Sequence, residues 1–450
     1  MNLALVLFSV VCCLLMLGFP VAFTLAGVSF AFAAIGMGLG FFDPGFIMAL
    51  PDRVFGIMTN QMLMAVPLFV LMGVLLEKSK IAENMLKQMA KLMSQLPAGL
   101  GLSVIFVGSL LAASTGIVGA TVVTMGLISL PAMLKANYPP SLATGLVCAT
   151  GTLGQIIPPS IALVLLADIL SSAYSESQLN SGVFSPETLS VGELFVAAVV
   201  PGLILVFCYL LYLLSQGTRL KPSDISVSAM PSIGSLMLTL LPPLMLIFLV
   251  LGTIILGVAT PTEAAAVGAF GALILAKRSG LTLKSLENSL LDTVKIIGMI
   301  FMILVGAACF SLVFRGLGGD EWVQSFFHEL PGGAMTALFV VMLLVFLLGF
   351  ILDFIEIIFV VVPIVGPPLM SMGVDPLWFG ILLAINLQTS FSTPPFGFAL
   401  FYLRGVADKS ISTSTIYKGV IPFIGIQLSV IILVVFFPEL VTWLPDQLLN

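Results

Sequence analysis

Two apolar stretches of this 450-residue chain each combine helix-breaking residues with hydroxyl or amide side chains. The breakers and hydroxyls of the first stretch, at 149–162, are Thr150, Gly151, Thr152, Gly154, Pro158, Pro159 and Ser160. The polar residues and prolines of the second, at 386–397, are Asn386, Gln388, Thr389, Ser390, Ser392, Thr393, Pro394 and Pro395. Proline removes a backbone donor and clashes with the preceding turn, so neither stretch is expected to form continuous helix. The freed carbonyl and hydroxyl oxygens suit a desolvated sodium ion, so we predict an ion site at each break.

The structural alternative is a pair of proline kinks whose hydroxyls bond back to their own helices. We favour ion binding, because unwinding at matched positions in two halves of a chain is what alternating access requires.

A third run, AASTGIVGATVVT at 112–124, gathers further hydroxyls and glycines, namely Ser114, Thr115, Gly116, Gly119 and Thr121. Glycine lets a backbone approach a neighbour closely. This run is therefore predicted to be the tip of a hairpin that forms a wall facing the breaks.

Asp353 and Glu356 stand in the otherwise apolar run GFILDFIEIIFVVVP. Carboxylates at membrane depth are costly and default to a functional hypothesis. Protonation coupling and an N-cap role for Asp353 are equally compatible with the spacing. Glu263 follows Thr260, Pro261 and Thr262 in a capping-box pattern, which favours a structural cap.

The composition points to lipid as the solvent of this chain, since 60% of the residues are hydrophobic and only 8% are charged. An ordinary soluble domain has about a quarter charged residues. The net charge of −5 includes no basic cluster, which excludes nucleic-acid binding on electrostatic grounds. All five cysteines lie in apolar runs without metal-ligand spacing, and no P-loop, HExxH motif or nucleophile elbow occurs, so we predict no cofactor, no catalytic residue and no enzyme.

Charge and hydropathy predict the topology. Lys and Arg gather in segments such as 78–91 and 277–295, which the positive-inside rule places in the cytoplasm, whereas the acidic segments 168–193 and 317–332 are predicted to face outward. Predicted spans run at about 3–19, 22–40, 56–77, 142–168, 193–216, 237–257, 262–279, 292–314, 376–403 and 418–437. Two further segments, 98–134 and 334–370, must return to their own side and are predicted re-entrant hairpins. Amphipathic helices at 77–96 and around DEWVQSFFHEL are expected to brace them.

An internal repeat relates the two halves. The sequence IIPPSIALVLL resembles STPPFGFALFYL, and Pro158 is separated from Pro394 by 394 − 158 = 236 residues. We predict one all-α polytopic membrane domain made of two inverted repeats with re-entrant helical hairpins and unwound helices. Repeat one covers about 1–216 (hairpin 98–134, broken helix 142–168) and repeat two about 237–437 (hairpin 334–370, broken helix 376–403), with a periplasmic insertion at 171–192 and a cytoplasmic linker at 217–236.

The chain resembles the large membrane subunit, the M or DctM-type permease, of tripartite ATP-independent periplasmic transporters. The motifs that carry the resemblance are LGFPVAFTLAG (17–27), MAVPLFVLMGVLLEKSKIAENML (64–86), GTLGQIIPPSIALV (151–164), PTEAAAVGA (261–269), GFILDFIEIIFVVVPI (349–364) and NLQTSFSTPPFGFALF (386–401). The resemblance implies an elevator-type carrier in the bacterial inner membrane that couples sodium to the uptake of an organic anion. It also implies two partners besides lipid, a small four-helix Q (DctQ-type) membrane subunit, expected as a separate chain, and a periplasmic substrate-binding protein.

The family sodium sites, transferred by motif, fall on the hairpin tips and the breaks. The residues assigned to sodium are Ser114, Thr115, Gly116, Gly119, Gly151, Thr152, Gly154, Asp353, Thr389, Ser390, Ser392, Thr393 and Pro394. The residues assigned to the substrate are Thr121, Pro158, Pro159, Asn386, Gln388 and Pro395.

Three other functions stay open at this stage. One is a self-sufficient sodium- or proton-coupled dicarboxylate carrier of similar design, and the second is a channel. The third, an intramembrane enzyme, has only Asp353 and Glu356 as candidate groups. The substrate itself is left open between C4-dicarboxylates, keto acids and sugar acids.

Overall fold

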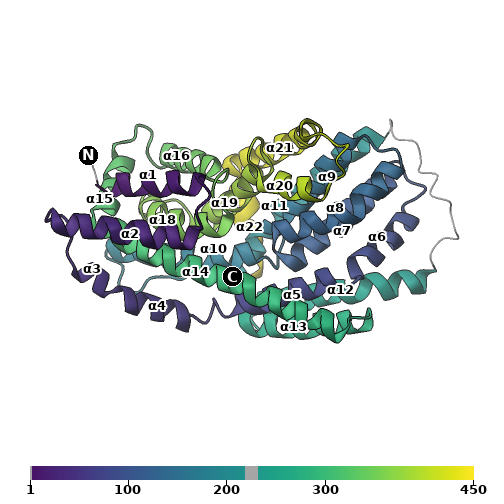
Figure 1. Ribbon diagram of the computed structural model, residues 1–450, viewed down its shortest axis with the longest axis horizontal. Helices are drawn as coiled ribbons and strands as arrows, with labels where there is room; N and C mark the ends of the chain where they lie inside the picture. The colour runs from purple at the N-terminus through teal and green to yellow at the C-terminus, as the bar shows by residue number, and fades with distance from the viewer. Residues whose placement is uncertain (1–2, 218–231, 450) are drawn as a thin grey trace. The chain divides into compact units, whose positions relative to one another are not determined.

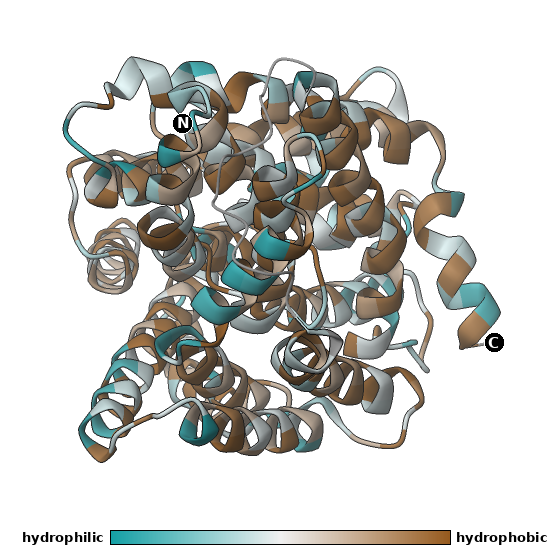
Figure 2. Cartoon of the chain, turned by 90° about the vertical axis from the view of Figure 1, so that its right-hand side faces the viewer, coloured by the Kyte–Doolittle hydropathy of each residue, from teal (hydrophilic) through white to brown (hydrophobic). Residues whose placement is uncertain are grey.

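The computed structural model describes residues 3–217 and 232–449, so most of the predicted linker at 217–236 lies outside the described residues. Within those ranges every regular element is a helix. Seven helical segments there are long and apolar enough to cross a membrane, at Val21–Gly38, Val118–Lys135, Val191–Gly217, Gly234–Ile255, Leu283–Gly316, Phe354–Ser371 and Thr413–Phe436. Figure 2 shows hydrophobic residues along most helices, with hydrophilic ones confined to short patches. The predicted all-α polytopic membrane fold is thus confirmed.

The chain divides into two compact units. Unit 1 runs up to Met64 and continues at Leu165–Ser190 and Val294–Gly380, and unit 2 comprises Ala65–Val164, Val191–Thr293 and the chain from Ile381. The helices of unit 1 are α1 (Leu3–Met16), α2 (Val21–Gly38), α3 (Gly45–Met48), α4 (Leu50–Thr59), α15 (Gly319–Glu329), α16 (Gly333–Leu348), α17 (Phe354–Glu356), η2 (Ile357–Val361) and α18 (Val362–Ser371).

Unit 2 contains most of the remaining elements (Figure 1). They are α5 (Ala65–Lys78), α6 (Ile81–Leu92), α7 (Gly99–Thr115), α8 (Val118–Lys135), α9 (Pro140–Thr152), η1 (Leu153–Gln155), α11 (Val191–Gly217), α12 (Ile233–Ile255), α13 (Pro261–Arg278), α20 (Phe398–Val406), α21 (Thr413–Phe436) and α22 (Glu439–Leu448). Three helices have residues in both units, namely α10 (Ile161–Asn180), α14 (Leu283–Gly316) and α19 (Pro376–Ser392).

The segment 98–134 forms a helical hairpin in unit 2, because α7 and α8 pack side by side and are joined by a tight turn (Figure 1). Gly116 ends α7 with φ +60°, a conformation that glycine adopts without the steric cost of a side chain. In unit 1, α16 is followed by a turn and by the continuous run α17, η2 and α18, which packs back against it.

Amphipathic helices flank both hairpins, as predicted. Helix α6 buries Met85, Leu86 and Met89 and exposes Lys87 and Lys91, and it packs against α7. Helix α15 packs against α16 and α18. The Thr260–Glu263 capping box is also confirmed, since Glu263 Oε2 accepts from the Thr260 backbone N–H at 2.8 Å.

The structure differs from the predicted elements at two places. The predicted span at 56–77 is wrong as a single helix, because Asn60 ends α4 and its side-chain oxygen accepts from the Met62 backbone N–H at 2.8 Å, which turns the chain before α5 begins. Helix α10 continues to Asn180, so within the predicted insertion at 171–192 the segment between α10 and α11 is only 181–190. Helices α3, α4 and α22 were not predicted.

The closest helix contact that the glycine positions indicate joins α9 to α21 in unit 2. A Cβ on Gly145 would lie 2.0 Å from the Gly419 carbonyl oxygen, and one on Gly419 would lie 2.0 Å from the Ser141 carbonyl oxygen. Backbone stands against backbone here, so neither helix can absorb an added methyl group by a side-chain rotation.

Gly145→Ala is therefore expected to destabilise the protein by about 1–3 kcal/mol, the usual cost of overpacking a tight contact. The measurement is the thermal unfolding midpoint of the detergent-solubilised chain. Gly425→Ala on α21 is the matched control, because nothing lies within 4 Å of its added Cβ. Equal midpoints for the two variants would contradict the tight contact.

Candidate functional site

The first predicted break exists in the structure and the first hairpin lies directly on it. Helix α9 ends at Thr152, η1 adds one 3₁₀ turn, and helix resumes only at Ile161. A Cβ on Gly154 would lie 2.9 Å from the Ala112 carbonyl oxygen, and one on Gly116 would lie 2.9 Å from the Ile161 backbone nitrogen. The hairpin turn thus covers the broken backbone at a distance that only glycine permits.

Hydroxyl groups form hydrogen bonds within each side of this junction. Thr115 Oγ1 and Thr121 Oγ1 lie 2.7 Å apart across the hairpin turn. Ser160 donates its hydroxyl to the Gly154 carbonyl at 2.7 Å, which closes the loop between α9 and α10. Pro158 and Pro159 are buried in the same loop.

Most of these hydroxyls bond back to their own helix, as the structural alternative expects. Ser114 and Thr115 both donate to the Leu111 carbonyl at 2.9 Å, and Thr152 donates to the Ala149 carbonyl at 3.0 Å. A hydroxyl that donates its proton still has oxygen lone pairs for a second partner. Back-bonding therefore orients these oxygens without excluding a cation.

Gln155 is a residue of the break that was not predicted as a site residue. Its side chain is 1% exposed, and neither its Oε1 nor its Nε2 has a hydrogen-bond partner. A buried polar group left without a partner costs about 1–3 kcal/mol. The signal in the sequence was an amide between Gly154 and the proline pair, whereas the prediction for this segment rests on hydroxyl and carbonyl oxygens.

The second break is also present, and it lies in unit 2. Helix α19 ends at Ser392 and α20 begins at Phe398, after the proline pair. The hydroxyls that back-bond to the preceding turn of α19 are those of Thr389, Ser390, Ser392 and Thr393. Pro395 is exposed.

Helix α20 connects this second break to the first hairpin. A Cβ on Gly119 would lie 2.9 Å from the Tyr402 ring, and α20 packs against both α8 and α9. Gly119 and Tyr402, which are more than 200 positions apart in the sequence, thus meet on one hairpin arm.

A buried polar network involves Gln388 of α19. Its Nε2 donates to Tyr209 Oη at 3.4 Å, and Gln427 Nε2 donates to the same oxygen at 2.7 Å. All three side chains are fully buried, and the Oε1 atoms of both glutamines lack partners. Gln388 therefore connects α19 to α11 and α21, in addition to its predicted substrate role.

Asp353 belongs to unit 1 and caps a helix there. Its Oδ1 accepts from the Phe354 backbone N–H at 2.8 Å, and Glu356 Oε2 accepts from the Asp353 backbone N–H at 3.0 Å. The N-cap role, one of the two alternatives for Asp353, is thus observed. Its role as a sodium ligand stays a prediction.

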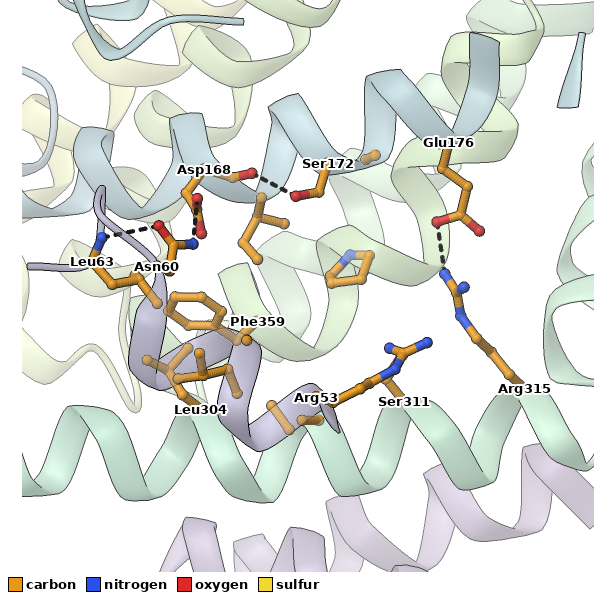
Figure 3. A pocket seen from close by; sticks show the side chains of 17 residues that line it. Arg53, Asn60, Leu63, Asp168, Ser172, Glu176, Leu304, Ser311, Arg315 and Phe359 are labelled. Atoms are coloured by element: carbon orange, nitrogen blue, oxygen red, sulfur yellow. Dashed lines mark hydrogen bonds and ion pairs between the residues drawn. The ribbon is translucent and has the colours of Figure 1, made fainter. Parts of the chain in front are cut away.

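Unit 1 also contains a cavity of about 360 Å³ that was not predicted. Figure 3 shows Asn60 and Asp168 at one end and Arg53, Glu176 and Arg315 at the other. The signal in the sequence was two arginines, Arg53 and Arg315, that stand outside the basic segments used for topology. The reasoning that marks charged groups in apolar surroundings as functional applies to them as well as to Asp353.

The breaks, the hairpin and the apolar helices define a polytopic membrane transport protein. Two solved transporters share this fold. The Alcanivorax borkumensis YdaH transporter matches with a TM-score of 0.62 at 14% identity, covering 98% of each chain. Neisseria gonorrhoeae MtrF matches with a TM-score of 0.57 at 13% identity, covering 87% of this chain and 83% of MtrF.

Residues 8–440 match the family described as tripartite ATP-independent periplasmic transporter, DctM component, and the chain belongs to this family. The large permease DctM of a C4-dicarboxylate transporter from Pseudomonas aeruginosa is 30% identical over 413 residues, which are 90% of this chain and 91% of that protein. The sialic acid transporter large permease SiaM from Vibrio cholerae is 29% identical over 445 residues, 97% of each. The chain is therefore a large permease subunit, a multi-pass protein of the bacterial inner membrane, and not an enzyme.

Gly116→Ala is expected to lower both the unfolding midpoint and the transport rate, because it adds a methyl group against the Ile161 backbone as well as the strain of a positive φ. The strain alone costs about 1–2 kcal/mol. Gly182→Ala is the control for this backbone strain alone, since Gly182 has φ +85° and its added Cβ would lie in open space. Thermal unfolding and uptake in proteoliposomes are the measurements, and transport of Gly116→Ala equal to that of Gly182→Ala would refute a role for the hairpin contact.

Proposed function

We propose that this permease imports a small organic anion by coupling its movement to sodium, with ions held at the junction of the first hairpin and the broken helix α9. The hairpins, breaks and matched motifs fit two inverted repeats and an elevator-type alternating access. The second break, at Thr389 to Pro395, is the proposed counterpart of the first in the other repeat.

The buried, partnerless amide of Gln155 is the single observation that carries the sodium proposal. Its Oε1 is a buried oxygen acceptor without a partner, and it belongs to the same short segment as Gly154 and Thr152. A small cation takes oxygen ligands of these kinds at unwound helical turns. The donor set therefore fits sodium, without a carboxylate in this segment.

The partners proposed for this chain follow from the tripartite family, whose large permeases work with a small membrane subunit and a periplasmic binding protein. We propose a four-helix Q-type subunit and a binding protein that delivers the anion. The relatives named above are named for different substrates, C4-dicarboxylate and sialic acid, at nearly equal identity. Relatedness alone therefore does not choose the substrate of this chain.

Sodium dependence tests the coupling. Gln155→Leu, Thr152→Val and Thr393→Val are each expected to raise the sodium concentration for half-maximal uptake by about tenfold or more, since an interaction with a charged partner is worth about 1.5–3 kcal/mol and about 1.4 kcal/mol is tenfold. The measurement is uptake in proteoliposomes against sodium concentration.

Two variants are the controls for the sodium experiment. Thr144→Val removes a buried, back-bonded hydroxyl from the same helix α9 away from the break, and Gln427→Leu removes a different buried glutamine. Both are expected to keep the wild-type sodium response. If Gln155→Leu instead raises the unfolding midpoint and leaves the sodium response unchanged, then the buried Gln155 amide only destabilises the fold. The ion site would then lie elsewhere.

Dependence on a binding protein separates this function from a self-sufficient carrier. Vesicles with both membrane subunits are expected to take up the anion only when the cognate binding protein is present outside. Equal uptake with and without that protein would support the self-sufficient carrier.

A further inference from the structure

The cavity in unit 1 is lined by the guanidinium groups of Arg53 and Arg315 at one end and by the carboxylate of Asp168 at the other (Figure 3). Its volume of about 360 Å³ falls within the range of small-molecule sites. Helices α4, α10 and α14 contribute most of its wall. The rest comes from Asn60 and Leu63 in the turn after α4 and from Phe359 and Pro363 of the second hairpin. None of its lining residues was assigned to sodium or substrate from the sequence.

Two guanidinium groups converge at one end. Arg315 donates from Nη2 to Glu176 Oε2 at 2.9 Å, and its Nε lies 3.0 Å from Asp320 Oδ2. Arg53 points toward the same end (Figure 3), where Arg315 repels its charge and Glu176 and Asp320 attract it. Within the described residues, the Arg53 side chain forms no hydrogen bond or ion pair of its own.

Glu176 and Asp320 balance the charges of the two arginines at this end, but the guanidinium donors of the exposed Arg53 have no partner among the described residues. An arginine has five N–H donors in a planar fork, and a carboxylate accepts two of them side by side. Arg53 has its whole fork free, while Arg315 is already held in place by Glu176 and Asp320. A carboxylate between them would relieve the repulsion and satisfy the Arg53 donors.

At the other end, the Asp168 carboxylate has a neutral partner and no cationic one among the described residues. Asp168 Oδ1 accepts from Asn60 Nδ2 at 3.0 Å, and Asn60 is held by the backbone N–H of Met62. No lysine or arginine pairs with Asp168 in the described chain. A carboxylate has about four lone-pair sites, so Asp168 can still accept from a ligand hydroxyl, whereas a ligand carboxylate there would meet a like charge.

Two serine hydroxyls also line the cavity. Ser172 donates to the Asp168 backbone carbonyl at 3.0 Å, and Ser311 is buried on the α14 wall. Serine hydroxyls both donate and accept, so these groups could exchange hydrogen bonds with the hydroxyls of a polyol chain. They offer little to the methylene groups of a simple dicarboxylate.

We propose that this cavity binds the transported anion and selects a hydroxylated monocarboxylate over an unsubstituted dicarboxylate, with the carboxylate held by Arg53 and Arg315 and a distal hydroxyl donated to Asp168. This assignment rests on the proposed transport of an organic anion, and it specifies that the anion is a hydroxylated monocarboxylate. It places substrate recognition in unit 1, in addition to the residues assigned from the breaks.

Direct binding to the permease purified with its small membrane subunit tests the proposal by titration calorimetry, with D-gluconate and succinate as probes. The wild type is expected to bind D-gluconate at least about tenfold more tightly than succinate. Arg53→Gln is expected to weaken both probes about tenfold or more, since both lose the same carboxylate partner.

Asp168→Asn is the decisive variant, because its two effects have opposite signs. It keeps an oxygen that can accept from Asn60, so the wall of the cavity is retained. D-gluconate binding is expected to weaken about tenfold, while succinate binding is expected to tighten because the like charge is gone. A merely structural role of Asp168 would weaken both probes together.

Asp52→Asn and Arg278→Gln are the controls. Asp52 is exposed next to Arg53 on α4 but does not line the cavity, and Arg278 belongs to unit 2. Both variants are expected to bind as the wild type does. Three results would overturn the proposal: tighter binding of succinate than of D-gluconate, no binding of either probe, or changes of the same sign for both probes in Asp168→Asn. Tighter binding of 6-aminohexanoate than of D-gluconate would also overturn it, because Asp168 would then recognise an ammonium group and not a hydroxyl.

Uptake separates this proposal from the proposed function. Sodium-driven uptake of succinate with no preference for D-gluconate leaves the transport function intact and refutes the selectivity. Absence of any sodium-driven anion uptake by the complete assembly refutes the transport function, whatever the calorimetry shows.

Discussion

Backbone groups in lipid have no water to bond to, and this constraint governs the structure. A broken helix at membrane depth is tolerated only where protein covers its backbone or a polar cavity meets it. In unit 2, the hairpin of α7 and α8 provides that cover, because Gly116 and Gly154 let two main chains touch. The same close contact sets the hairpin turn against the broken backbone, and this junction is where we propose the ion site.

The two polar regions of the chain differ in chemistry. The junction at the first break offers oxygens and the Gln155 amide, with no charged side chain in the segment from Thr150 to Ser160, which suits a small cation that is released in every cycle. The cavity of unit 1 offers charges of both signs at opposite ends, which suits an organic ion with a defined orientation. Each region lies within one compact unit, so each can be tested by itself.

Much of the fold was predictable because lipid imposes long apolar helices, and hairpins and proline breaks leave strong local signals. The helix ends at Thr152 and Ser392 and the Thr260–Glu263 cap follow from residues within a few positions of each end. The prediction of a single span at 56–77 is wrong for an equally local reason. The Asn60 side chain turns the backbone there, and a hydropathy profile does not detect such a turn. Helices α3 and α4, of 4 and 10 residues, are shorter than the window over which helical periodicity is recognised.

The sequence by itself determined that this is a membrane permease with two interrupted helices, because composition, proline spacing and family motifs act locally or add up along the chain. Only the tertiary structure decided which polar groups meet. Arg53, Asp168 and Arg315 come from three helices far apart in the sequence, and Gln155 differs from a satisfied core glutamine only in having no partner. Whether a buried charge or amide has a partner is a property of the three-dimensional neighbourhood, and no pattern within one helix specifies it.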